Sequence, residues 1–178
     1  TFTTSDQGDD DYNCTVCGAG QIALNAQTAC EACEDGKFQT MQIAPDHGYC
    51  KTCEAGREFV SDTSPCSVCD DGKYQPENSA ADVECKFCGA GTYFIDKDSS
   101  CKTCDTGMYQ AANDEANAQC KYCAPGFAPE DVSKDCVECP EGKYQDLSES
   151  SEAKCKFCET GTEFKDDTSA CRDCSAGQ

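Results

Sequence analysis

The sequence of 178 residues has no tryptophan, two methionines and one histidine, and no apolar run approaches the roughly 18 residues of a membrane helix. Hydrophobic residues make up 38% of the chain, but this share includes 20 cysteines. The remaining Leu, Ile, Val and Phe cannot bury enough apolar area to offset the conformational entropy lost on folding. Covalent bonds or metal ions must therefore hold the chain together, or it is disordered. A conventional enzyme core is not expected.

Basic residues are also scarce. There are 14 Lys and Arg against 34 Asp and Glu, which gives a net charge of −20. A surface this acidic repels phosphate groups, so nucleic-acid and membrane-surface partners are disfavoured. It suits a hydrated extracellular surface that attracts Ca²⁺ loosely. The chain begins at Thr1 without a signal peptide, and we expect it to be a processed piece of a longer protein.

Every cysteine belongs to a Cys-x-x-Cys pair, and the pairs recur regularly. Successive first cysteines are separated by intervals of 16 residues (short segments) and of 19 or 20 residues (long segments) in strict alternation. The period is 35 residues, with one extra residue in the first copy. Such regularity identifies a tandem array. The first cysteines of the pairs are Cys14, Cys30, Cys50, Cys66, Cys85, Cys101, Cys120, Cys136, Cys155 and Cys171.

Glycine and aromatic residues follow the same register. A glycine at a fixed offset is typical of a turn with positive φ, where a Cβ atom would be strained. We expect the aromatic residue after each turn to pack on the disulfides as a miniature core. In the long segments a glutamine follows this aromatic residue. The glycines are Gly20, Gly36, Gly56, Gly72, Gly91, Gly107, Gly126, Gly142, Gly161 and Gly177; the aromatics are Phe38, Tyr74, Tyr109 and Tyr144 in long segments and Phe59, Tyr93, Phe94, Phe127 and Phe164 in short ones; the glutamines are Gln39, Gln75, Gln110 and Gln145.

The fold predicted from this pattern is small and disulfide-rich: an elongated tandem array of cysteine-rich modules with short β-hairpins and turns and little helix. A helical turn is expected at most in Ala111 to Gln119 and in Leu147 to Lys154, because no sustained i, i+3, i+4 apolar pattern occurs. The expected division is an N-terminal arm at 1–13, repeats at 14–49, 50–84, 85–119 and 120–154, and a truncated repeat at 155–178, after which the parent chain continues.

Three chemistries explain repeated Cys-x-x-Cys pairs. Disulfides are preferred, because bridging a loop of about 16 residues contributes roughly 3 kcal/mol in the chain-entropy model, and several bridges would replace the missing core. They imply an oxidising compartment, hence a secreted or cell-surface protein. Structural Zn²⁺ held by four thiolates is the weaker alternative. Dithiol redox catalysis needs a single pair on a different scaffold, so it is disfavoured.

Two regular pairing schemes fit the period. In a ladder, the second cysteine of each pair bonds the first of the next, which leaves Cys14 and Cys174 over. In a crossed scheme, each short segment is a closed module and all cysteines are used, and we favour it. The crossed scheme predicts Cys14–Cys30, Cys17–Cys33, Cys50–Cys66, Cys53–Cys69, Cys85–Cys101, Cys88–Cys104, Cys120–Cys136, Cys123–Cys139, Cys155–Cys171 and Cys158–Cys174. A Cys33–Cys50 bond would refute it.

Three stretches carry a family resemblance: Cys85 to Thr92, Cys155 to Thr162, and Cys136 to Tyr144. The sequence Cys-Lys-Phe-Cys-x-x-Gly-Thr followed by Cys-x-x-Cys-Pro-Glu-Gly-Lys-Tyr resembles the ephrin-receptor-like cysteine-rich repeat, which is grouped with tumour-necrosis-factor-receptor-like and growth-factor-receptor-like modules. Similar arrays occur in large extracellular surface proteins of protists and algae. The resemblance covers residues 14–178 and implies a crossed 1–3, 2–4 pairing by analogy. It is informative for architecture and weak for function.

Residues for catalysis are few. His47, the one histidine, lies in a turn-like sequence, and no Ser/His/Asp set or phosphate-binding loop occurs. No catalytic residue, resident metal or cofactor is expected, and Ca²⁺ and structural Zn²⁺ are weak alternatives. Asn13 begins an Asn-Cys-Thr sequon, the one formal N-glycosylation site, although disulfide formation at its cysteine would compete with the glycan.

The leading functional hypothesis is a non-enzymatic extracellular structural protein, a disulfide-stapled rod that forms a surface coat, spacer or filament by self-association. The alternative is a receptor or adhesion ectodomain that binds a protein ligand. It predicts exposed anchor residues in a divergent repeat, and the candidates are Ile22 to Ala26 and Met41 to His47. Neither hypothesis includes nucleic acid or membrane insertion of this segment.

Overall fold

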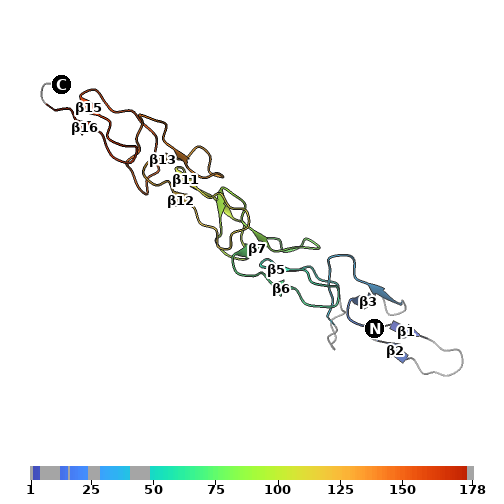
Figure 1. The fold of residues 1–178 in the computed structure, drawn as a ribbon. Coiled ribbons are helices and arrows are strands. Elements are labelled where there is room, and N and C mark those ends of the chain that lie inside the picture. The colour runs from blue at the N-terminus through green and yellow to red at the C-terminus, as the bar shows by residue number, and fades with distance from the viewer. Residues whose placement is uncertain (1, 5–12, 16, 24–28, 41–48, 176–178) are drawn as a thin grey trace. The chain divides into compact units, whose positions relative to one another are not determined.

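The computed structural model of the chain describes residues 2–4, 13–15, 17–23, 29–40 and 49–175. Over these ranges the regular structure consists of strands of two or three residues joined by turns, and no helix is present (Figure 1). The predicted fold class, a small disulfide-rich tandem array with short β-hairpins, is confirmed. The helical turns expected in Ala111 to Gln119 and Leu147 to Lys154 are wrong, because both segments form bends and turns. Residues with positive φ interrupt each of them, Asn117 at 56° and Glu149 at 51°.

The chain divides into two compact units. Unit 1 comprises Thr1–Lys86 and Asp96–Ser100, and unit 2 comprises Phe87–Ile95 and Cys101–Gln178. This division does not follow the repeat boundaries, because Asp96–Ser100 belongs by sequence to the third repeat but by contacts to unit 1.

The strands of each unit pair two by two, and every pair with a defined register is antiparallel. In unit 1, β1 (Phe2–Thr4) pairs with β2 (Asn13–Thr15), β3 (Gln21–Ala23) with β4 (Cys30–Ala32), and β5 (Arg57–Glu58) with β6 (Ser67–Val68). The strand β7 (Lys73–Tyr74) pairs with β8 (Lys86–Phe87), of which Lys86 is the last residue of the first part of unit 1. In unit 2, β9 (Thr92–Tyr93) pairs with β10 (Lys102–Thr103), β11 (Met108–Tyr109) with β12 (Lys121–Tyr122), β13 (Phe127–Ala128) with β14 (Val137–Glu138), and β15 (Thr162–Glu163) with β16 (Arg172–Asp173).

One register recurs wherever a long segment meets the next cysteine pair. The aromatic residue of the segment pairs with the residue after the first cysteine, as in Phe38↔Lys51 and Tyr144↔Lys156. Phe2 pairs with Thr15, the residue after Cys14, in the same way. Residues 1–13, expected to be an arm outside the repeat, thus contain a strand that pairs like the end of a long segment.

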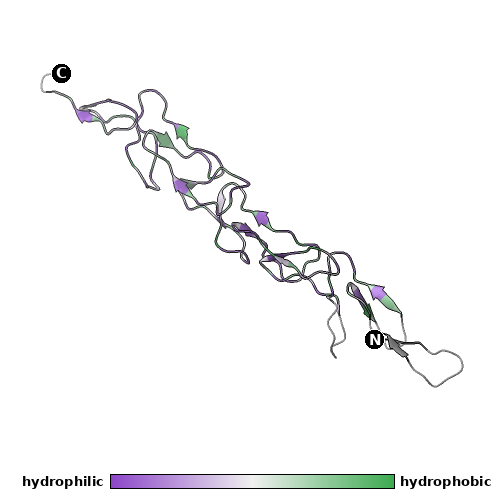
Figure 2. Ribbon diagram, turned by 60° about the horizontal axis from the view of Figure 1, so that its bottom comes forward, coloured by the Kyte–Doolittle hydropathy of each residue, from purple (hydrophilic) through white to green (hydrophobic). Residues whose placement is uncertain are grey.

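The interior consists largely of cysteine. One cluster contains Cys53, Cys66 and Val83, and Phe38 and Phe59 pack against it. At these two positions the expected packing of aromatic residues on a disulfide is confirmed. The same arrangement does not hold throughout, since Phe127 and Phe164 are 38% and 43% exposed. Much of the ribbon carries hydrophilic colour in Figure 2, in keeping with a chain whose covalent bonds replace a large apolar core.

The glycines adopt the expected conformation. Nine of the ten repeat glycines have φ between 74° and 91°, the left-handed region that residues with a Cβ atom rarely occupy. The tenth, Gly177, lies outside the described residues. The prediction of a positive-φ turn after each Cys-x-x-Cys pair is confirmed for the nine.

Candidate functional site: the contact between successive repeats

The disulfides form a ladder, so the favoured crossed pairing is wrong. The second cysteine of each pair bonds the first cysteine of the next pair, and Cys33–Cys50 is among these bonds. Of the pairs predicted from the sequence, none is present among the described disulfides, and Cys174 has a free, exposed thiol. The bonds are Cys17–Cys30, Cys33–Cys50, Cys53–Cys66, Cys69–Cys85, Cys88–Cys101, Cys104–Cys120, Cys123–Cys136, Cys139–Cys155 and Cys158–Cys171.

The physical reason lies in how the chain folds at each pair. Cys30 closes the loop that precedes it and Cys33 closes the loop that follows it, so a Cys-x-x-Cys pair is a junction between two loops. The loops span 13 residues in short segments and 16 or 17 in long ones. A cysteine in a disulfide has no thiolate. The eighteen cysteines in these bonds therefore cannot ligate Zn²⁺, as the structural-zinc alternative would require.

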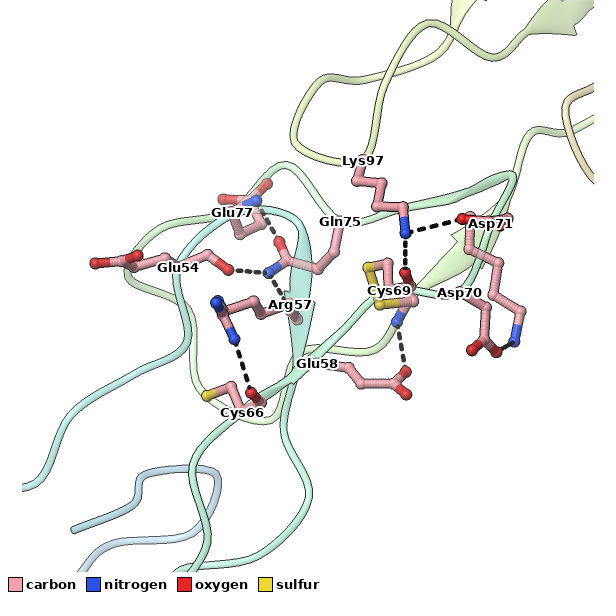
Figure 3. Close-up of a disulfide and its surroundings, with 12 residues drawn as sticks. Glu54, Arg57, Glu58, Cys66, Cys69, Asp70, Asp71, Gln75, Glu77 and Lys97 are labelled. Carbon is pink, nitrogen blue, oxygen red and sulfur yellow. Dashed lines mark hydrogen bonds and ion pairs between the residues drawn. A yellow bond between two sulfur atoms is a disulfide. The ribbon is translucent and has the colours of Figure 1, made fainter. Parts of the chain in front are cut away.

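A buried glutamine joins two of the long segments to the hairpin before them. Gln75 is 2% exposed. Its Nε2 donates to the carbonyl oxygens of Glu54 at 3.3 Å and Arg57 at 2.8 Å, and its Oε1 accepts from the N–H of Glu77 (Figure 3). All polar atoms of this amide that lie in the interior are thus satisfied, as burial requires. Gln145, 1% exposed, repeats the arrangement with the carbonyls of Ala124 and Phe127 and the N–H of Leu147.

Gln110 occupies the same position but differs. It is 4% exposed, and neither its Nε2 nor its Oε1 has a partner within the described residues. The carbonyl of Gly89, which matches those of Glu54 and Ala124, already accepts from the Thr92 hydroxyl at 2.6 Å and the Thr92 N–H at 3.1 Å. Thr92 therefore occupies both lone pairs of the Gly89 carbonyl, which leaves no acceptor there for the Gln110 amide.

Backbone hydrogen bonds repeat the same contact four times. The N–H of the short-segment glycine donates to the carbonyl of the glutamine in the following long segment, and the N–H of that glutamine donates to a carbonyl in the next hairpin tip. The glycine–glutamine bonds are Gly20–Gln39, Gly56–Gln75, Gly91–Gln110 and Gly126–Gln145, each 2.7 Å. The tip residues that accept are Asp62, Lys97, Val132 and Asp167, which recur every 35 residues.

The glycines also provide space at this contact. A Cβ atom on Gly20 would lie 3.0 Å from the Asp62 carboxylate, and one on Gly126 would lie 3.0 Å from the Thr168 methyl group. A Cβ on Gly107 would overlap the backbone of Ser151. Gly20, Gly107 and Gly126 are therefore required twice, for their positive φ and for the close approach of the following repeat.

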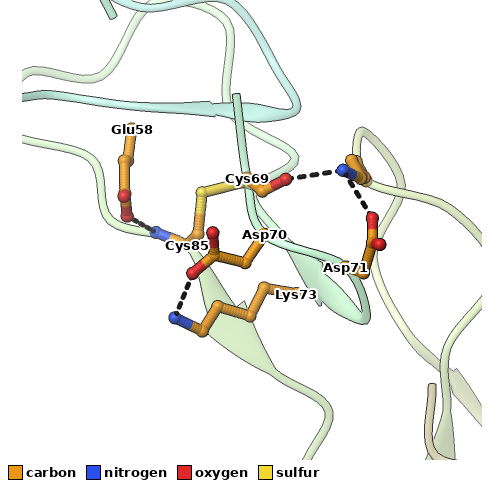
Figure 4. Close-up of polar contacts among 7 residues, drawn as sticks. Glu58, Cys69, Asp70, Asp71, Lys73 and Cys85 are labelled. Atoms are coloured by element: carbon orange, nitrogen blue, oxygen red, sulfur yellow. Dashed lines mark hydrogen bonds and ion pairs between the residues drawn. A yellow bond between two sulfur atoms is a disulfide. The ribbon is translucent and has the colours of Figure 1, made fainter. Parts of the chain in front are cut away.

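Polar side chains reinforce the contact in unit 1. Lys97, from the next hairpin tip, donates from Nζ to the carbonyl of Cys69 at 2.6 Å and pairs with Asp71 at 3.1 Å (Figure 3). Across the Cys69–Cys85 disulfide, the N–H of Cys85 donates to Glu58 Oε2 at 3.2 Å (Figure 4). These contacts surround a disulfide with hydrogen bonds, and they link residues up to 28 positions apart.

The acidic residues of the hairpin tips stabilise turns. Asp131 accepts from the N–H of Ser133 at 2.8 Å and from its hydroxyl at 2.7 Å. These two bonds, the backbone one first, lower the pKa of Asp131 below its ordinary value. The hydroxyls of Ser169 and Thr168 lower the pKa of Asp166 likewise. These carboxylates therefore serve as hydrogen-bond acceptors within the turns.

Several predicted sites fall wholly or partly outside the described residues. His47 and the stretch Met41 to His47 do, as does most of Ile22 to Ala26, while only the backbone of Asn13 is described, in β2. Within the described ranges, no cluster of three or more His, Cys, Asp or Glu is arranged to hold a metal ion. A search of the same ranges finds no helix that is both long and apolar enough to cross a membrane.

Comparison of the chain with models of known protein families finds no match, and comparison with curated protein sequences finds none either. The ladder of disulfides and the paired short strands define the class from the structure alone: a tandem array of disulfide-bonded cysteine-rich repeats. The number of disulfides is typical of an extracellular or secreted protein.

Sequence reasoning missed the role of the glutamines. It noted that Gln39, Gln75, Gln110 and Gln145 share one position but assigned them no contact. A polar residue repeated at a fixed place beside a glycine and an aromatic residue is the signal that could have identified a buried hydrogen-bonding position.

Proposed function

We propose that the protein is a non-enzymatic extracellular structural protein, in which the disulfide-bonded repeat array forms a surface coat, spacer or filament. One observation carries this proposal: the contact built by glycine, glutamine and hairpin tip recurs at a period of 35 residues. An array in which each repeat contacts its neighbours extends by adding copies of the same contact. The acidic surface keeps such an array hydrated and disfavours anionic partners.

The described polar groups fit this assignment. The side-chain amides of buried Gln75 and Gln145 donate hydrogen bonds to backbone carbonyls of the neighbouring hairpin. The carboxylates of Asp131 and Asp166 accept hydrogen bonds within turns. We therefore assign no catalytic residue and no resident cofactor.

The competing proposal is a receptor or adhesion ectodomain, as the resemblance to ephrin-receptor-like repeats suggests. One observation favours it: Phe157 is 67% exposed, and Tyr49 is 63% exposed. The residues one and two periods before Phe157, Tyr122 and Phe87, are half-buried. Exposed aromatic residues are frequent anchors of protein interfaces. The Nζ of Lys143 lies 4.9 Å from the Phe157 ring centroid, so this ring is partly covered within the chain.

Electron microscopy of the native material separates the two proposals. A structural protein gives ordered fibres or a continuous coat built from the chain. A receptor gives monodisperse particles, some with a bound partner, and replacing Phe157 with Ala removes that partner. Monodisperse particles that bind nothing and assemble into nothing at any concentration would refute the structural assignment.

A further inference from the structure

A groove lies at the same place in two successive repeats. One groove, with a volume of about 530 Å³, is lined by Tyr74 and Lys86, and the other, of about 310 Å³, is lined by Tyr109 and Lys121, one period later. All lining residues of the first groove belong to unit 1 and all those of the second to unit 2. We call these two surfaces the tyrosine grooves. Because they recur with the repeat, they follow from the fold itself rather than from one irregular loop.

Tyrosine and lysine are neighbours across a strand pair in each groove. Tyr109 of β11 and Lys121 of β12 are antiparallel partners, so their side chains stand on the same face of the pair. Tyr74 and Lys86 hold the same places in the pair of β7 and β8. Both tyrosines are half-buried and both lysines are exposed. Each groove therefore offers part of an aromatic side chain beside an ammonium group.

The fourth repeat shows what this pair of residues does when a carboxylate is near. Lys156 Nζ lies 3.4 Å from Asp146 Oδ1 and 4.9 Å from the Tyr144 ring centroid. The acid thus pairs with the lysine, whose ammonium group lies over the ring. Tyr144 and Lys156 are one period after Tyr109 and Lys121, so identical residues are compared at the same place in the repeat.

The tyrosine grooves lack this internal partner. The residues one and two periods before Asp146 are Ala111 and Pro76. In the part of the chain that the structure describes, no carboxylate forms an ion pair with Lys86 or Lys121. Within the same ranges, no cation–π contact is made to either groove tyrosine. The accessible part of the ring and the lysine amine are therefore both available to a ligand.

The other lining residues determine the charge that a ligand can carry. Each groove has more carboxylates than lysines, and all of these carboxylates are exposed. An anion would meet the carboxylates and a cation would meet the lysine, whereas a neutral ring with many hydroxyl groups accepts from the ammonium group and donates to the carboxylates. The C–H groups of such a ring also pack on the face of an aromatic side chain. The carboxylates are Glu77, Asp82 and Glu84 in the first groove and Glu115 and Asp135 in the second.

We propose that each tyrosine groove binds a short stretch of a neutral polysaccharide, with a sugar ring packed on the tyrosine and its hydroxyl groups bonded to the lysine and the surrounding carboxylates. The inference rests on the proposed structural function and names the partner of the coat or filament. Because the chain carries the groove twice, a polymer that repeats one unit gains avidity that a single sugar does not. The acidic surface does not oppose a neutral partner.

Isothermal titration calorimetry on the whole 178-residue chain, with its disulfides verified by mass spectrometry, tests the proposal. The neutral probes are hexasaccharides of β-1,4-glucan, β-1,3-glucan and β-1,4-mannan. The charged probes are hexasaccharides of alginate, an anion, and of chitosan, a cation in the mildly acidic buffer used for all probes. At least one neutral probe should bind, and the charged probes should bind about tenfold more weakly, because each meets a like charge in the groove. Failure of all three neutral probes would overturn the proposal, and so would preferential binding of alginate or chitosan.

Three tyrosines at the same repeat position provide the decisive comparison. Tyr74→Leu and Tyr109→Leu should each remove one equivalent of bound sugar per chain, and the double variant should remove both. Tyr144→Leu is the matched control, because Lys156 covers that ring, and it should leave the amount of bound sugar unchanged. An equal loss from Tyr144→Leu would refute the assignment to the tyrosine grooves.

Further variants guard against loss of structure. Tyr74→Phe/Tyr109→Phe keeps both rings and should still bind. Lys86→Ala/Lys121→Ala removes only exposed side chains and should weaken binding about tenfold, since a hydrogen bond from a charged group is lost in each groove. Lys102→Ala, an exposed lysine outside both grooves, should have no effect. Unchanged binding by the lysine double variant would contradict the proposal.

Electron microscopy of the same samples separates this proposal from the structural function. Fibres or a coat formed by a chain that binds no polysaccharide would refute the role of the tyrosine grooves and leave the structural function standing. Polysaccharide binding through the grooves by a chain that forms neither fibre nor coat would do the reverse.

Discussion

Gln75 Nε2 donates a 2.8 Å hydrogen bond to the carbonyl of Arg57, a residue 18 positions earlier in the chain. Gln145 makes the equivalent bond to Phe127 at 2.9 Å, also across 18 positions. A side chain of each long segment thus fastens the hairpin of the preceding short segment. Because these amides are almost fully buried, losing one leaves backbone groups without water to replace it.

Replacing Gln75 with Leu should destabilise its repeat by about 1–3 kcal/mol, since two carbonyls and one N–H would lose their partner at a part-buried position. Hydrogen exchange at the Gly56 amide, measured with disulfides intact, reports the local opening. Gln110→Leu is the matched control, because the Gln110 amide has no partner in the described part of the chain. Gln110→Leu should lower the free energy of unfolding much less than Gln75→Leu does, or should raise it. Equal losses in the two variants would contradict a specific role for the Gln75 amide.

Gly107→Ala should be more destabilising than Gly142→Ala. Both glycines have φ of 82°, so both variants bear the same backbone strain of roughly 1–2 kcal/mol. Only at Gly107 would the new Cβ overlap Ser151 of the following repeat. Urea unfolding followed by tyrosine circular dichroism compares the two midpoints. Midpoints that shift equally would show that space between repeats does not restrict this position.

Tryptic digestion of the unreduced protein distinguishes the ladder from the crossed scheme in a single product. The tryptic peptide 38–51 contains one cysteine, Cys50. The ladder links it to peptide 1–37 through Cys33, whereas the crossed scheme links it to peptide 58–73 through Cys66. We expect only the first product by mass spectrometry, and recovery of the second would overturn the described connectivity.

The repeat itself was predictable because it rests on local requirements. A Cys-x-x-Cys pair followed by Gly20 or Gly56 requires a positive-φ turn wherever it occurs, and the structure has that turn. Short polar segments between such turns leave room only for short hairpins. The fold class therefore follows from spacing, without any knowledge of which cysteines bond.

The pairing was not predictable in the same way. Crossed and ladder schemes share one period, and spacing alone does not separate Cys33–Cys50 from Cys17–Cys33. The choice depends on contacts between repeats, such as the bond from Gly56 N–H to the Gln75 carbonyl. Such contacts hold the long segment against the hairpin and bring Cys69 to Cys85. The analogy with receptor modules, which favoured closed modules, did not apply.

The turn at Asp131 should weaken in acid. Ser133 donates two hydrogen bonds to the Asp131 carboxylate, and they hold its pKa below the ordinary value. Because the folded-state pKa is lowered, this stabilisation is complete above the pKa of the unfolded chain and is lost as the pH falls through the folded-state pKa. Titration by NMR should therefore give Asp131 a lower midpoint in the native protein than in denaturant. Ser133→Ala removes the hydroxyl bond, so the midpoint should rise while that of Asp166, capped by its own Thr168 and Ser169, stays unchanged. A native midpoint equal to the denatured one would mean that the carboxylate does not cap this turn.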